Sequence, residues 1–437
     1  MSEKTARLPS SADTFRCAHP ISSLFLPIFG HDSWPGVPKM GFNININHHY
    51  TSKVYTTRST ISGNVSVCPE RDISFRCVQI ALIGTYHARI DMLPVPRIID
   101  NDFLTLDMPI NEELYPSDRI FRAGKTYQIP FHFTLPYALS KDACDKLSES
   151  GHIQELHMRL PPTMGQWERD DMSPVMARVE YNVVARLLKR NTSELGQTIE
   201  ASQPIRVMPE FSEDPPLGIT EQDTRYSLSK TRFIRKSLLS TQKDQVTLTT
   251  AQPGAVHLST QGQAFADSPA TVMLHLHYKS ASSFSSPPEV NVTQVKLETI
   301  TWFSGTPMKT LPELGEARDS SGTRHELKYV ASVKLPPTQL QDIAWHQESN
   351  TTGRDSSAWT AAIGVPIHLP TAHKMFLPTF HNCFLARTYV LHLSVGIAGA
   401  KTTLSVPLQV ATEAIENQTP KSVGDELPNF HAAMAWG

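Results

Sequence analysis

Histidine and cysteine are the side chains in this sequence that could hold a metal ion, and the chain has 18 of the first and 5 of the second. His275 and His277 stand two positions apart, so on a strand they would point to the same side. His48 and His49 are adjacent and would point to opposite sides. Neither pair has an acidic residue or a cysteine at the spacing of a metal site. We therefore expect solvated histidines on strand faces, with no metal ion and no cofactor.

Two further clusters could support catalysis. Cys383 follows His381 by two residues and could be a thiol nucleophile, and Asp170 with Asp171 could form an acid pair. A catalytic cysteine and histidine are brought together by the fold, however, and spacing of two residues on a strand supplies no third group to orient the base. The G-x-S-x-G motif, the P-loop and the dinucleotide-binding fingerprint are absent from the sequence. We expect a buried structural Cys383, a solvated loop around the aspartates, and no enzyme activity.

A short basic run offers a more plausible binding site. It consists of Lys230, Arg232, Arg235, Lys236 and Lys243. At the junction of two domains these cations could face phosphorylated or acidic protein tails. The alternative, a solvated connector between the domains, is the interpretation that we favour.

Composition limits the classes of protein that fit. A formal net charge of −2 creates no field that would draw the chain to nucleic acid or to an anionic membrane. No segment approaches the roughly 20 apolar residues of a membrane-spanning helix, and Met1–Ser11 is too polar for a signal peptide. The five cysteines form no C-x-x-C pair, so neither a zinc ribbon nor a disulfide framework is indicated. These observations predict a cytoplasmic protein.

Alternation of apolar and polar residues predicts strands along most of the chain. Residues 124–136 are typical, because Ile129, Phe131 and Phe133 alternate with polar residues or proline and should face a core. Residues 138–157 have the best helical pattern, and the Pro- and Asp-rich residues 92–118 indicate a surface loop. The 33 prolines also favour many short strands joined by turns. The predicted fold class is all-β, with two tandem immunoglobulin-like sandwiches and one short helix in the first.

The same patterns divide the 437 residues into five segments. The predicted segments are a flexible N-terminal segment (1–41), a first sandwich (42–208), a linker (209–239), a second sandwich (240–411) and a polar tail (412–437).

The order of several motifs resembles the arrestin family, in particular the α-arrestin-like proteins of fungi. Residues 60–67 (T-I-S-G-N-V-S-V) and 80–86 (I-A-L-I-G-T-Y) are similar to a strand pair of the arrestin N-domain, and 124–136 (G-K-T-Y-Q-I-P-F-H-F-T-L-P) to its "G-x-Y-x-F-P-F-x-F-x-L-P" segment. Residues 177–186 and 378–394 resemble later strands of the N- and C-domains. The resemblance spans residues 42–411 and implies two arrestin-like domains.

The resemblance also implies a function: a non-catalytic adaptor or scaffold for membrane-protein trafficking, endocytosis or signalling, which binds cytoplasmic tails of membrane proteins at the plasma membrane or endosomes. Two alternatives stay open, a cargo subunit of an endosomal sorting coat and an enzyme that has borrowed the fold. Family members that recruit ubiquitin ligases carry PPxY motifs. This sequence has four Pro-Pro pairs, and none has a tyrosine at the fourth position of the motif. The pairs are Pro161-Pro162, Pro215-Pro216, Pro287-Pro288 and Pro336-Pro337.

Overall fold

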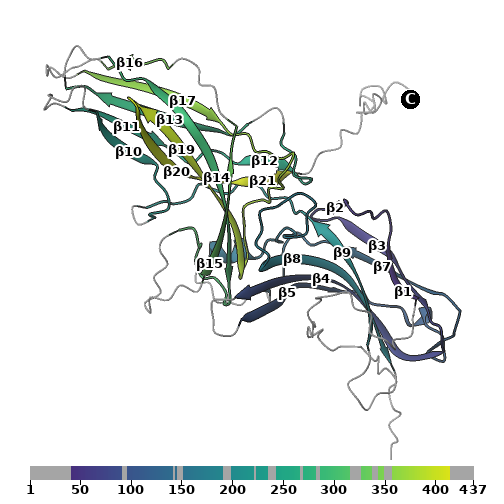
Figure 1. Ribbon diagram of the computed structural model, residues 1–437. Coiled ribbons are helices and arrows are strands. Elements are labelled where there is room, and N and C mark those ends of the chain that lie inside the picture. The colour runs from purple at the N-terminus through teal and green to yellow at the C-terminus, as the bar shows by residue number, and fades with distance from the viewer. Residues whose placement is uncertain are drawn as a thin grey trace, which may run out of the picture.

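The computed structural model of the chain describes twelve segments. They are residues 41–90, 96–140, 143–144, 151–189, 198–220, 223–234, 243–265, 269–281, 286–314, 326–336, 343–348 and 357–413. Over these residues the protein is an all-β structure of two sandwiches, which meet at the middle of the molecule (Figure 1). The prediction of the fold class is thereby confirmed.

The first sandwich consists of a three-stranded and a six-stranded sheet. The smaller sheet contains β1 (Gly41–Ile46), β3 (Thr60–Cys68) and β7 (Tyr127–Thr134). The larger sheet runs in the order β2 (Val54–Tyr55), β9 (Ile199–Val207), β8 (Ala177–Lys189), β4 (Ile73–Ile90) and β5 (Arg97–Asp107), with β6 (Ile120–Phe121) also paired to β4.

The second sandwich has two main sheets. The first runs β10 (Ser229–Ile234), β11 (Asp244–Thr250), β13 (Thr271–Lys279), β17 (Ala358–Pro366) and β16 (His346–Gln347). The second runs β15 (Glu326–Lys334), β14 (Val290–Ser304), β19 (Leu385–Ile397) and β18 (Phe380–His381), with β20 (Ala400–Leu408) also paired to β19. A parallel pair completes it, β12 (Val256–Ser259) and β21 (Val410–Glu413).

Strict alternation places every second residue of β7 in the first core. Ile129, Phe131 and Phe133 are 0%, 2% and 4% exposed, as predicted, while the residues between them face solvent. In the neighbouring strand β3, Gly63 lies opposite Phe131, and a Cβ atom at Gly63 would lie 2.0 Å from the main-chain oxygen of Asn45. Close packing of β1, β3 and β7 therefore requires glycine at this position.

The predicted surface loop 92–118 is wrong over residues 97–107, which form the edge strand β5. Its acidic residues suggested a loop, but two of them have partners on β4. The Thr85 hydroxyl donates to Asp102 Oδ1 at 2.8 Å, and His87 Nδ1 lies 2.6 Å from Asp100 Oδ1. Cross-strand pairing of this kind lets a strand carry residues that are rare in sheets.

The helix is shorter than predicted. α1 covers Gly151–His157, a 3₁₀ turn η1 covers Glu112–Leu114, and residues 141–142 and 145–150 of the predicted helix lie outside the described residues. The predicted linker 209–239 includes a strand of the second sandwich, since β10 pairs with β11. Two end segments were predicted, 1–41 and 412–437. Residues 1–40 of the first and 414–437 of the second lie outside the described residues.

The two sandwiches share apolar contacts. The core cluster of the first sandwich continues into residues of the second half of the chain, namely Phe303, Met375, Leu377, Phe380 and Leu385. The ring of Tyr86 on β4 stacks on Phe384, with 5.7 Å between ring centroids. The junction is therefore a packed interface, and side chains that lie in it are held by both sandwiches.

Candidate functional site

A loop of the first sandwich, Trp167–Ser173, enters the second sandwich and forms the polar part of the junction (hereafter the junction loop). Arg387 on β19 is fully buried and holds this loop with two hydrogen bonds. Its Nη1 donates to the main-chain oxygen of Asp171 and its Nη2 to Ser173 Oγ, each at 2.8 Å. The Asp171 carboxylate turns inward and accepts from the main-chain nitrogens of Gly165 at 2.7 Å and Ser173 at 3.1 Å.

Charged residues of the junction loop also reach across. Arg169 donates to the main-chain oxygens of Gln261 and Thr371, at 2.5 Å each. Asp170 forms an ion pair with Lys374, and the hydrogen bond from Lys374 lowers the pKa of Asp170 below its ordinary value of 3.8. The predicted solvated loop therefore holds for Asp170, whose side chain is exposed, and is wrong for Asp171, which is buried.

Met172 shows how deeply the junction loop enters. Its side chain is 4% exposed and belongs to the core of the second sandwich, not the first. Met172 has a backbone φ of 57°, a value that residues other than glycine rarely adopt. Such a conformation persists where the surrounding packing determines it. Met172 therefore acts as an apolar anchor between the two sandwiches.

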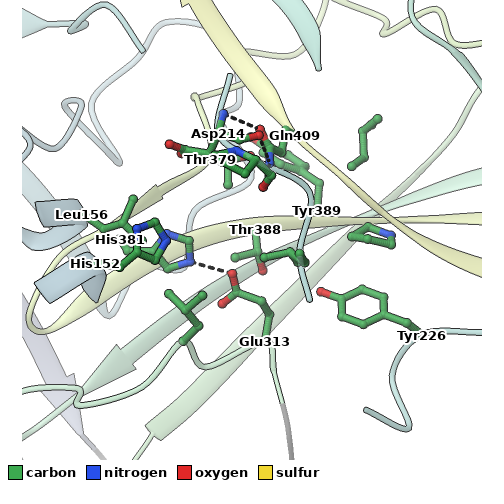
Figure 2. A pocket seen from close by; sticks show the side chains of 15 residues that line it. His152, Leu156, Asp214, Tyr226, Glu313, Thr379, His381, Thr388, Tyr389 and Gln409 are labelled. Atoms are coloured by element: carbon green, nitrogen blue, oxygen red, sulfur yellow. Dashed lines mark hydrogen bonds and ion pairs between the residues drawn. The ribbon is translucent and has the colours of Figure 1, made fainter. Parts of the chain in front are cut away.

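A small pocket lies between α1, the linker and the second sandwich, as Figure 2 shows. Its cavity volume is about 40 Å³, far below the roughly 300–1,000 Å³ of small-molecule sites. Inside it, His381 Nε2 lies 2.7 Å from Glu313 Oε1, and both side chains are buried. The second oxygen of Glu313, Oε2, has no hydrogen-bond partner among the described residues. Burial raises the pKa of the neighbouring Tyr389 to about 12.

Hydrogen bonds to both sandwiches hold the linker in place beside this pocket. Arg159 forms two hydrogen bonds to the Asp214 carboxylate, at 2.8 and 2.7 Å. The main-chain nitrogen of Asp214 donates to Gln409 Oε1 at 3.0 Å, as Figure 2 shows. A hydrogen-bonded bridge between Phe211 and Thr412 adds a further attachment. These contacts limit the space that the pocket could gain by movement of the linker.

A third feature of the junction combines two cysteines with one histidine. Cys144, His157 and Cys383 are each less than 5% exposed. His157 Nδ1 lies 3.7 Å from Cys144 Sγ and 3.6 Å from Cys383 Sγ. Burial, and then the electrostatic interaction with His381, lowers the pKa of His157 to about 4, so its ring is neutral near pH 7. Sequence reasoning considered Cys383 with His381, but the structure pairs Cys383 with His157 instead.

The basic run is not gathered into one site within the described residues. Lys230 donates to the main-chain oxygen of Thr403 at 2.7 Å, and Arg232 donates to Thr402 Oγ1 at 3.0 Å, so both side chains connect β10 to β20. Lys243 is exposed just before β11. The remaining two cations, Arg235 and Lys236, lie outside the described residues. The hydrogen bonds of Lys230 and Arg232 indicate a structural role within the second sandwich.

The histidines singled out from the sequence are not part of the cluster of Cys144, His157 and Cys383. His275 and His277 are both on β13, and His277 Nε2 lies 3.7 Å from Glu348 Oε1. His49 contacts the Tyr55 hydroxyl at 3.2 Å. Within the described part of the chain, the single group of three side chains placed to share a metal ion is Cys144, His157 and Cys383. Sequence reasoning missed it because 226 residues separate His157 from Cys383.

No known family model matches the chain, and no curated protein matches it either. No helix among the described residues is both long and apolar enough to cross a membrane. The class of protein is thus defined by its architecture: two β-sandwiches in tandem, joined by a packed junction.

Proposed function

We propose that the protein is a non-catalytic adaptor of the arrestin type, which binds cytoplasmic segments of membrane proteins during trafficking, endocytosis or signalling. It would work in the cytoplasm and at the surface of the plasma membrane or endosomes. The proposal is supported by the order of sequence motifs given above and by the tandem sandwiches. The small volume of the junction pocket also favours a binding protein, because that pocket holds little more than water molecules.

The observation that carries the proposal is the edge strand β15. Among the described strands it pairs with β14 alone, so it stands at the edge of its sheet in this part of the chain. Tyr329 and Val330 on this strand are 39% and 43% exposed. Extended peptides add to such edges through main-chain hydrogen bonds, and alternate side chains supply specificity. A cytoplasmic tail is extended and unstructured enough to bind in this way.

The test compares two single substitutions. Val330→Lys places a charge on the edge strand, which is how natural proteins block added strands. Val175→Lys is the matched control, because Val175 is 95% exposed and lies in a turn outside the sheets. Tagged wild type and both variants are expressed in a fungal cell, and the proteins bound to each are identified by mass spectrometry. Tail peptides of the recovered membrane proteins are then titrated against the purified chain.

The proposal predicts that the wild type and the Val175→Lys variant recover membrane proteins that the Val330→Lys variant loses. Their tail peptides should bind with micromolar affinity, about −8 kcal/mol. Recovery of no membrane protein by the wild type, or tail peptides that fail to bind at hundreds of micromolar, would contradict the proposal.

A further inference from the structure

Three side chains with metal-binding atoms converge where the two sandwiches meet. Cys144 and His157 belong to the first sandwich, and Cys383 lies between β18 and β19 of the second. Their two Sγ atoms and one imidazole nitrogen all lie within 4.8 Å of one another. Each side chain is at least 95% buried. The convergence therefore requires both sandwiches to be in place.

The two sulfur–nitrogen distances agree with edges of a metal-centred tetrahedron. Zinc binds thiolate sulfur at about 2.3 Å and histidine nitrogen at about 2.0–2.1 Å, and tetrahedral angles then place sulfur and nitrogen about 3.6 Å apart. The two sulfur–nitrogen distances here are 3.7 Å, from Cys144, and 3.6 Å, from Cys383. No movement of the side chains is needed to bring these edges to the ideal length.

Both sulfurs face the same ring nitrogen of His157. The Nδ1 atom of a neutral imidazole has one lone pair, or else carries one proton. It can therefore make one good hydrogen bond, whereas Cys144 and Cys383 approach the same Nδ1 atom of His157 at nearly equal distances. Cys383 Sγ also lies 4.0 Å from the main-chain oxygen of Ala143, so its thiol has a second acceptor. A cation would instead be bound by all three atoms at once. Two thiolates also neutralise the charge of a divalent ion, which suits a buried position.

We propose that Cys144, His157 and Cys383 bind one Zn²⁺ ion that links the two sandwiches. The ligands are the two thiolates and His157 Nδ1, and a water molecule completes the tetrahedron. Binding releases the two thiol protons to solvent. The ion would hold α1 against the turn between β18 and β19, beside the junction pocket. The inference is independent of the proposed function, because a metal link would fix the junction whatever the protein binds.

The experiment uses the full-length chain, purified under reducing conditions, stripped of metal and titrated with Co²⁺. Tetrahedral Co²⁺ with thiolate ligands gives intense ligand-field bands and a sulfur-to-cobalt charge-transfer band. We expect saturation at one equivalent and displacement of the Co²⁺ by one equivalent of Zn²⁺. Cys383→Ser should remove the charge contributed by that sulfur and weaken binding by at least about tenfold. Cys68→Ser is the matched control, because Cys68 is a half-buried cysteine on β3 outside the cluster.

A second readout separates a metal link from a general loss of folding. In the wild type and in the Cys68→Ser variant, Zn²⁺ should slow hydrogen exchange both in α1 and in the turn that contains Cys383. In the Cys383→Ser variant it should not. Three results would overturn the inference. They are a reduced wild-type chain that gives no saturable Co²⁺ spectrum, equal Co²⁺ affinity in wild type and Cys383→Ser, and a disulfide between Cys144 and Cys383 whose reduction yields no metal affinity.

Discussion

The guanidinium of Arg387 donates a hydrogen bond to the main-chain oxygen of Asp171, although 216 residues separate the two in sequence. The relationship joins a central strand of the second sandwich to the junction loop of the first. Because Arg387 is fully buried, solvent cannot replace its bonds when one partner is removed.

Arg387→Met keeps most of the side-chain volume and removes both bonds to the junction loop. We expect the free energy of unfolding to fall by roughly 3 kcal/mol, since two bonds to a charged donor are lost and the main-chain oxygen of Asp171 is left as a buried acceptor. Ser173→Ala removes one acceptor and should cost about 1 kcal/mol. Urea unfolding measures both. A Met variant as stable as the wild type would show that the cost of burying the guanidinium offsets its hydrogen bonds.

Met172→Ala should destabilise the protein by about 2–5 kcal/mol, because it leaves a cavity in the core of the second sandwich. The loss should also speed hydrogen exchange in β14, since Thr299 of that strand contacts the Met172 sulfur at 3.5 Å. Hydrogen exchange followed by mass spectrometry measures this. An effect confined to the first sandwich would contradict the anchoring role of Met172.

The ion pair between Asp170 and Lys374 predicts a dependence on pH. The pKa of Asp170 is lower in the folded protein than its ordinary value of 3.8. The pair therefore stabilises the fold fully at pH values above 3.8, and this contribution is lost as the pH falls through the pKa of the folded state. Both groups are partly exposed, so Asp170→Asn should cost less than about 1 kcal/mol at pH 7. The difference from wild type should shrink toward zero as unfolding is measured at successively lower pH. In a double-mutant cycle, Lys374→Met should add little to Asp170→Asn.

Phe131→Ala tests the core of the first sandwich. The ring is 2% exposed and contacts Phe133, so truncation should cost about 3–5 kcal/mol. Gln128→Ala, on the exposed face of the same strand, is the control and should change stability by less than about 0.5 kcal/mol. A cost below 1 kcal/mol for Phe131→Ala in chemical denaturation would mean that the site collapses around the missing ring.

Prediction from sequence succeeded where the signal is local. Alternation over residues 124–136 was enough to place Phe131 and its neighbours inward, because a strand with one buried face must repeat every two residues. It correctly predicted a buried Cys383. It could not predict the partners of Asp170, Asp171 and Cys383, which lie more than 200 residues away along the chain. Composition describes such residues as polar or small, and only the packing of two sandwiches decides what they contact.

The protein should not bind WW domains through a PPxY contact. None of its four Pro-Pro pairs is followed by tyrosine at the required position, and Pro161 and Pro162 are also buried. Isolated WW domains of HECT-type ligases titrated with the purified chain should show no binding at hundreds of micromolar. Saturable binding at about −8 kcal/mol, lost when one pair is changed to alanine, would restore direct recruitment of a ubiquitin ligase.

The insertion of the junction loop also sets an order of events during synthesis. A ribosome adds about 5–20 residues per second, so roughly 10–40 s pass between the synthesis of Asp171 and that of Arg387, 216 residues later. For that interval the nascent chain has no second core into which Met172 can insert. A chain that stops before residue 387 keeps this methionine and its neighbouring carbonyl groups exposed. The apolar residues of the first sandwich that pack on Phe380 and Leu385 lack their partners over the same interval, so the junction can close only late in synthesis.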